Sequence, residues 1–197
     1  MSQTTLHDAA AADDIAAIRR LLDGGAVIDA RDGQGRTALL VATHRNAVGA
    51  AGALIDAGAD VNAKDHIQDS PYLYAGARGH LDILKLTLAH GADLRSTNRF
   101  GGTALIPAAE RGHVETVRTL IAAGVAVDHV NNLGWTALLE AVILGDGGDR
   151  HVRIAQLLLQ AGADVNLPDR DGVTALAHAR ARGQAGMAAL LTAAGGR

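Results

Sequence analysis

The sequence predicts an all-α solenoid of six helix–turn–helix repeats joined by β-turn loops, and two periodic markers in the chain predict it. The first marker is a hydroxyl residue that recurs every 33 residues until the last interval, which is 38. The second is a glycine that follows each hydroxyl residue after 21 residues, or after 26 in the fifth copy. A fixed period of this length is typical of stacked repeats in which each unit contacts only its neighbours. The hydroxyl residues are Thr4, Thr37, Ser70, Thr103, Thr136 and Thr174, and the glycines are Gly25, Gly58, Gly91, Gly124, Gly162 and Gly195.

The fourth copy shows how one repeat is expected to fold. Thr103 opens a first helix, with its hydroxyl placed to accept from backbone N–H groups two or three residues on. A turn at 111–113 leads to a second helix, which carries apolar residues at helical spacing over 114–121. That helix ends at Gly124, which can take the left-handed conformation that a helix C-terminus often needs.

Individual copies carry local departures with physical consequences. Pro71 follows Ser70 at the first helical position, where its missing N–H costs nothing. Pro107 lies deeper in the fourth inner helix, so we expect it to remove one intrahelical bond and to tilt the start of that helix. Gly49 and Gly52 lie inside the second outer helix and cost about 1 kcal/mol each relative to Ala, which predicts that the second repeat is the softest.

The order helix, turn, helix, β-turn in 33 residues resembles the ankyrin repeat. Residues 4–9 and 70–75 are similar to its opening motif, residues 79–84 to its middle and residues 57–62 to its end. The resemblance covers almost the whole chain and implies one ankyrin-repeat domain over 1–197. Residues 134–140, together with the Gly-Asp-Gly-Gly stretch that follows, are similar to small stand-alone bacterial ankyrin-repeat proteins. The expected repeats are about 1–32, 33–65, 66–98, 99–131, 132–169 and 170–197, with a five-residue insertion at 146–150 in the fifth.

Composition excludes several classes of function. The chain has no cysteine, which leaves no disulfide or thiolate chemistry. Its net charge of −3 argues against a nucleic-acid partner. No apolar run approaches the roughly 18 residues of a membrane span, and residues 1–6 carry no signal-peptide pattern. We therefore expect a cytoplasmic protein with neither a nucleic-acid nor a membrane partner.

Catalytic and metal chemistry is not expected. His80, His113 and His151 are predicted to occupy one inter-helix turn position, and repetition at one position indicates a scaffold role. Glu110 and Glu140 are expected in separate helical contexts, with no pocket that sets one carboxyl pKa against another. No cofactor, metal or catalytic residue is predicted. One alternative stays open, in which the 146–150 loop offers carboxylate oxygens to a hard cation, although EF-hand spacing is absent.

The resemblance implies a binding surface made of β-turn tips and the exposed ends of the inner helices. Its charged members are seven arginines against three carboxylates, a formal +4 in a chain whose total is −3. Its apolar members cluster in the fourth and fifth repeats around the single tryptophan, and Trp and Arg are frequent hot-spot residues. The alternatives are that the arginines are simply solvated and that the tryptophan packs on its neighbouring turn. The predicted partner-binding residues are Arg36, Arg45, His66, Ile67, Asp69, Arg78, Arg99, Phe100, Glu110, Arg111, Asn132, Leu133, Trp135, Ile143, Leu144, Arg170, Asp171 and Arg182.

The functional prediction is a non-enzymatic protein–protein interaction module that holds an acidic segment of another, unidentified protein in its concave groove. A second hypothesis is self-association, because the last copy, 186–194, lacks a strongly polar outer face and its Leu and Met residues are expected to be exposed. We expect a monomer rather than a homo-oligomer.

Overall fold

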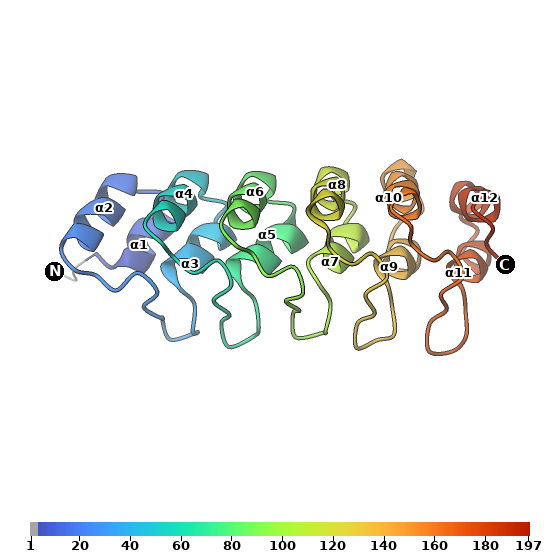
Figure 1. The fold of residues 1–197 in the computed structure, drawn as a ribbon, viewed down its shortest axis with the longest axis horizontal. Helices are drawn as coiled ribbons and strands as arrows, with labels where there is room; N and C mark the ends of the chain where they lie inside the picture. The colour runs from blue at the N-terminus through green and yellow to red at the C-terminus, as the bar shows by residue number, and fades with distance from the viewer. Residues whose placement is uncertain (1–3) are drawn as a thin grey trace. The chain divides into compact units, whose positions relative to one another are not determined.

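A computed structural model describes residues 4–197, and within this range the chain forms twelve helices and no strand. The all-α prediction is therefore confirmed (Figure 1). The helices are α1 (Leu6–Ala11), α2 (Ile15–Asp23), α3 (Ala38–His44), α4 (Val48–Asp56), α5 (Pro71–Arg78), α6 (Leu81–Ala89), α7 (Leu105–Glu110), α8 (Val114–Ala123), α9 (Ala137–Ile143), α10 (Asp149–Gln160), α11 (Ala175–Ala181) and α12 (Ala185–Ala193).

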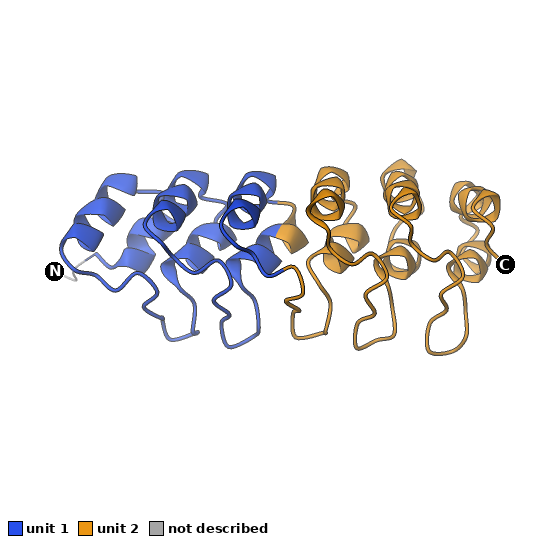
Figure 2. Cartoon of the chain, viewed as in Figure 1, with its two compact units in different colours: residues 1–75, 80–93 blue, residues 76–79, 94–197 orange. Residues whose placement is uncertain are grey.

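The helices gather into two compact units (Figure 2). Unit 1 holds the chain up to Ala75 together with His80–Asp93, and unit 2 holds Gly76–Gly79 and Leu94–Arg197. The boundary falls within α5. The expectation of a single domain over 1–197 stays a prediction.

Each unit is built in two helical layers. In unit 1, α1 packs on α3 in the inner layer, while α2, α4 and α6 pack in sequence in the outer layer. In unit 2, α7, α9 and α11 form the inner layer and α8, α10 and α12 the outer layer. The connections between successive repeats run out as long turns beside the inner helices (Figure 1). The inner layer can be thin because alanines such as Ala38, Ala42 and Ala137 are completely buried at the helix contacts.

Hydroxyl caps begin the inner helices, as the sequence indicates, with two exceptions. The Thr37 hydroxyl accepts from the N–H of Leu40 at 3.2 Å, and Ser70, Thr136 and Thr174 make the equivalent bond. Thr4 was expected to open the first repeat, but Thr5 is the cap. Thr5 accepts from the Asp8 N–H at 3.1 Å, and the Asp8 carboxylate accepts from the Thr5 N–H at 3.0 Å, which forms a capping box.

Thr103 is the second exception, and Pro107 is the reason. With no N–H at Pro107, the Thr103 carbonyl accepts instead from Ile106 at 3.2 Å. The Ile106 N–H is the group that would otherwise reach the Thr103 hydroxyl, so the hydroxyl is left buried and without a partner. Helix α7 consequently begins at Leu105 with no side-chain cap. The expected loss of one backbone hydrogen bond at Pro107 is confirmed, and the expected side-chain cap at Thr103 is wrong.

The periodic glycines mark the ends of the outer helices. Gly124 closes α8 with φ of 92°, and the other five have φ between 83° and 95°. Backbone in this left-handed region strains any residue with a side chain, which explains why glycine recurs there.

The insertion in the fifth repeat lengthens a helix as well as a turn. Helix α10 starts at Asp149, so the last two inserted residues, Asp149 and Arg150, form its first turn. His151 therefore lies inside α10, whereas His80 and His113 precede α6 and α8 as N-caps. The prediction that all three share one turn position is wrong for His151, because the helix begins early.

Candidate functional site

The turn of residues 131–135 is organised by one side chain, that of Asn131. The Asn131 carboxamide oxygen accepts from the N–H groups of Leu133 at 2.9 Å and Trp135 at 3.0 Å. The backbone closes the same turn, since the Asn131 N–H donates to the Trp135 carbonyl at 3.0 Å. The turn is thus held from inside and presents Leu133 outward, with half of its surface exposed.

The neighbouring turns of unit 2 repeat this design. Asn98 accepts from Phe100 and Gly102, and Asp169 accepts from Asp171 and Val173. These Asx turns satisfy backbone donors that would otherwise need water, so the tips are preorganised.

The turns of unit 2 are also fastened to one another. The Asn132 N–H donates to the Phe100 carbonyl at 2.9 Å, and the His129 ring donates to the Gly101 carbonyl at 2.7 Å. The next tip is held by packing: a Cβ at Gly134 would collide with the side chain of Arg170. These contacts bring together three successive tips that carry predicted partner-binding residues.

Exposed apolar surface lies on two of these tips and at the C-terminal end of α9. Phe100 and Leu144 are each about half exposed, like Leu133. Trp135 is only partly exposed. Ile143, expected at the surface, is 7% exposed because it faces the core as the last residue of α9, so its prediction as a surface contact is wrong.

Basic residues belong to the same predicted surface of unit 2, and one of them contacts an apolar tip. Arg99 stacks over the Phe100 ring at 4.8 Å, a cation–π contact that orders both side chains. Arg111 donates to the Ala77 carbonyl at 2.7 Å. Among the predicted partner-binding residues of unit 2, five arginines stand against Glu110 and Asp171, a formal excess of +3. The five are Arg78, Arg99, Arg111, Arg170 and Arg182.

Glu140 is a functional candidate that sequence reasoning missed. It belongs to α9, is 6% exposed, and its Oε1 accepts from the Asn131 carboxamide N–H at 2.8 Å. Burial first, and then the negative charge of Glu110, raise the pKa of Glu140 to about 7, against opposing effects of Asn131 and Arg111. The expectation that no carboxyl pKa is set by another carboxylate is wrong. An acidic residue four positions after the capping Thr136 was the available signal, because the equivalent residue of the fourth repeat, Pro107, is buried.

A different titratable residue anchors the last turn. The His178 Nε2 lies 2.7 Å from the Asp169 Oδ2, and the Asp169 Oδ1 holds the turn. The hydrogen bond with His178 and the N–H of Val173 lower the pKa of Asp169.

Unit 1 presents a less basic surface than expected. Arg36 forms an ion pair with Asp32 at 2.7 Å within its own turn, and that pairing lowers the Asp32 pKa to about 2 despite the opposing effect of desolvation, the largest single influence. The formal charge of +4 expected for the binding surface did not count Asp32. Because Asp32 neutralises Arg36, this pair adds no net charge to the surface of unit 1. Arg45 is exposed at the end of α3.

The other predicted residues of unit 1 lie on a turn held by Asp65. Asp65 accepts from the N–H groups of Ile67 and Asp69, and the His66 N–H donates to the Gln34 carbonyl at 3.2 Å. Ile67 is about half exposed, so unit 1 offers one apolar tip of its own.

The insertion loop holds a buried histidine. The Nδ1 of His151 lies 2.6 Å from Asp146 Oδ1, and its Nε2 lies 2.8 Å from the Glu110 carbonyl. The N–H of Gly148 also donates to Asp146, and these hydrogen bonds lower the pKa of that carboxyl. Asp146 is thus engaged within the loop. Across residues 4–197, no three His, Cys, Asp or Glu side chains lie close enough together to hold a metal ion.

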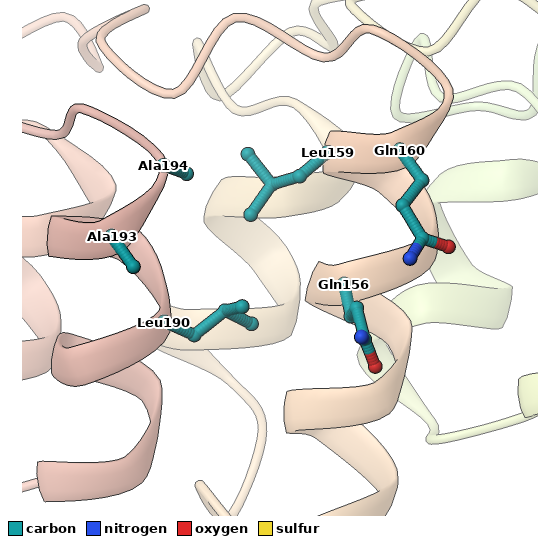
Figure 3. Close-up of a pocket in the computed structure, with 6 residues that line it drawn as sticks. All are labelled: Gln156, Leu159, Gln160, Leu190, Ala193 and Ala194. Carbon is teal, nitrogen blue, oxygen red and sulfur yellow. The ribbon is translucent and has the colours of Figure 1, made fainter.

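An open depression of about 330 Å³ lies between α10 and α12 on the outer layer of unit 2 (Figure 3). It is lined by Gln156, Leu159, Gln160, Leu190, Ala193 and Ala194. The self-association hypothesis expected exposed Leu and Met residues on α12, and this is wrong for Met187 and Leu191, both completely buried. Leu190 keeps part of its surface exposed.

Within the described part of the chain, no helix is long and apolar enough to cross a bilayer.

The sequence matches the family described as ankyrin repeats (3 copies) over residues 1–65 and 72–169. The ankyrin repeat protein YahD of Escherichia coli strain K12 is 50% identical over 56 residues, and that stretch covers 28% of this chain and 28% of YahD.

Solved structures are similar over nearly the whole chain. An ankyrin repeat domain from Acinetobacter baumannii AYE is 67% identical with a TM-score of 0.95, over 98% of both chains. The ankyrin repeat protein EF0377 is 41% identical with a TM-score of 0.91, again over 98% of both chains. The ankyrin repeat domain of Bcl-3, a member of the IkappaB family, is 28% identical with a TM-score of 0.88 and is matched over 88% of its length by all of this chain.

Proposed function

Because the chain belongs to the ankyrin-repeat family, whose domains generally act as protein–protein interaction modules and are typically non-enzymatic, we propose that its unit 2 binds an acidic segment of a partner protein. The surface that does so is the set of turn tips and inner-helix ends that carries Arg99, Phe100, Arg111, Leu133 and Trp135. We place the protein in the cytoplasm, where it binds as a monomer.

The observation that carries this proposal is the combination of apolar tips and basic residues on one preorganised frame. Phe100 and Leu133 are each about half exposed, and their turns are joined by the hydrogen bond from Asn132 to Phe100. A rigid frame loses little entropy on binding, so exposed apolar side chains there contribute more to affinity than mobile ones would. The surrounding excess of positive charge selects partners with carboxylates and steers their approach.

The alternative readings concern single residues. Trp135 is partly buried, so the indole has some packing within the protein. Arg111 donates one N–H to the Ala77 carbonyl. Neither contact uses the whole side chain: the indole remains partly accessible and Arg111 stays exposed.

Selection from a random-sequence peptide display library against the purified protein tests the proposal. We expect the recovered peptides to combine Asp or Glu with large apolar residues, and their affinity to fall as salt rises. Leu133→Ala and Arg99→Glu should each weaken binding at least about tenfold, as hot-spot changes do. A matched control is Arg118→Glu on the exposed face of α8. This substitution changes the net charge by the same amount as Arg99→Glu, but in an outer-layer helix and not on a turn tip.

Two results would overturn the proposal. One is recovery of peptides without an excess of acidic residues. The other is equal loss of affinity in Arg118→Glu and Arg99→Glu, which would mean that overall charge and not this surface governs binding.

A further inference from the structure

Glu140 links the inner helix α9 to the turn of residues 131–135, which is called the recognition turn because the proposed function assigns it to partner binding. Its Oε1 accepts from the Asn131 carboxamide N–H at 2.8 Å, and the oxygen of the same carboxamide accepts from Leu133 and Trp135. One amide group therefore connects a buried carboxyl to the two residues expected to contact a partner. Any change in the charge of Glu140 acts directly on the group that shapes the turn.

The surroundings of Glu140 favour its uncharged form. Glu140 is 6% exposed, and the like charge that acts on it is that of Glu110 at the end of α7. Arg111, which follows Glu110, offsets part of this repulsion, but one of its N–H groups is committed to the Ala77 carbonyl. An ionised carboxylate here would have the Asn131 N–H as its hydrogen-bond donor and a neighbouring carboxylate opposing it.

The histidines on the helices that pack against α9 have partners of their own. Helix α10 contributes His151, which lies between Asp146 and the Glu110 carbonyl. Helix α11 contributes His178, which lies against Asp169. The charges that act on Glu140 are those of Glu110 and Arg111.

We propose that Glu140 is a proton-controlled anchor of the recognition turn, so that unit 2 binds an acidic segment more tightly when Glu140 carries its proton. The inference rests on the proposed function for its effect on binding, but not for its effect on the turn. With the proton in place, a neutral carboxyl accepts from Asn131 and the turn keeps the geometry described above. When the proton leaves, a buried negative charge pulls on the Asn131 amide and adds repulsion beneath a surface that receives carboxylates.

The turn itself provides a readout without any partner. The amide resonances of Leu133 and Trp135 report the hydrogen bonds to Asn131, and we expect both to titrate with a midpoint near pH 7. Glu140→Gln keeps an acceptor for Asn131 but has no proton to lose, so it should abolish that titration. The amides of Asp171 and Val173 report the turn anchored by Asp169 and should titrate alike in both proteins.

Two further variants sharpen the assignment. Glu110→Gln removes the like charge and should move the midpoint of the Leu133 and Trp135 amides to lower pH. Glu115→Gln removes an exposed carboxylate from α8 that pairs with Arg118, and should leave the midpoint unchanged. Persistence of the titration in Glu140→Gln, or an equal displacement by both of these variants, would overturn the proton-controlled anchor.

Binding is measured with a synthetic peptide in which Asp residues flank a central Phe and Leu, and whose carboxylates stay ionised above about pH 5.5. One unit of charge at roughly 8 Å in an effective dielectric of about 40 corresponds to about a fivefold weaker affinity. We expect that loss in the wild type between about pH 6 and pH 8, and no such loss in Glu140→Gln. Equal pH dependence in the two proteins would refute the effect on binding. If the peptide fails to bind at either pH, the proposed function fails, while the amide titration still decides whether Glu140 controls the turn.

Discussion

Replacing Glu140 with Gln should stabilise the protein at neutral and alkaline pH but not in acid. The folded state raises the pKa of this carboxyl from 4.5 to about 7. Below about pH 4.5 the group is protonated in both states, so it contributes no pH-dependent term. Between about pH 4.5 and pH 7 the folded protein keeps a proton that the unfolded chain has released, and the free energy of unfolding of the wild type falls as pH rises. Above about pH 7 the carboxyl is ionised in both states, and the free energy of unfolding no longer falls because of Glu140.

The size of this effect follows from the shift. Each unit of pKa difference is worth about 1.4 kcal/mol, so the displacement corresponds to a ceiling of about 3 kcal/mol. Glu140→Gln keeps the acceptor for Asn131 and removes the titration. The difference in free energy of unfolding between Glu140→Gln and the wild type should therefore grow by about 2 to 3 kcal/mol from pH 4 to pH 8.

Urea unfolding followed by circular dichroism at several pH values measures this difference. Glu115→Gln serves as the matched control, because that carboxylate is exposed and its removal should leave the pH profile of the wild type unchanged. A constant difference between Glu140→Gln and the wild type across the whole pH range would refute the reasoning, since it would mean that Glu140 titrates alike in the folded and unfolded states.

Five other substitutions, grouped into three tests, probe local features by the same unfolding measurement. Tyr72→Phe removes a hydroxyl that is completely buried without a hydrogen-bond partner, and should raise stability by about 1 kcal/mol; a loss of stability would show that the hydroxyl is paired. Thr37→Val removes a working cap and should cost about 1 kcal/mol, whereas Thr103→Val removes a hydroxyl that caps nothing and should be neutral or stabilising; equal costs would contradict the account of the fourth repeat. Gly52→Ala should add about 1 kcal/mol because the nearest atom to its new Cβ lies 3.9 Å away, while Gly49→Ala should gain less because its Cβ would lie 2.9 Å from a side chain of α2. Equal gains in stability at these two glycines would show that the Ile15 side chain of α2 moves away from a Cβ at position 49 without a loss of free energy.

The periodic part of the structure could be predicted because it depends on local chemistry. A hydroxyl that caps a helix and a glycine that ends one act within a few residues, so Thr37 and Gly124 take their expected roles. The same local reasoning fails at Thr103 because Pro107, four residues away, redirects a single backbone hydrogen bond. Thr103 and Pro107 are both plain in the sequence. The outcome depends on whether the Ile106 N–H donates to the hydroxyl or to the carbonyl of Thr103, which the sequence does not decide.

The candidate site was predicted less well because burial and pairing depend on tertiary contacts. The sequence predicted Arg36 as an unpaired charge, but its turn places the guanidinium 2.7 Å from the Asp32 carboxylate. Ile143 reads as exposed until the end of α9 turns it inward. Glu140 was expected in a helical context separate from Glu110, and only packing shows that it is buried beside Asn131 and influenced by Glu110.

The two last turns of unit 2 show how a repeated frame acquires individual chemistry. An Asx side chain with two acceptor oxygens can hold a turn with one oxygen and accept from a histidine ring N–H with the other, as Asp169 does with His178. A carboxyl at the equivalent helix position requires a donor instead, and Asn131 supplies one to Glu140. An aspartate at 131 would set two carboxylates against each other, and a glutamate at 178 would do the same with Asp169. The turn residue and the helix residue must therefore match in pairs, which lets each repeat keep the same backbone while a different side chain pairs with its turn.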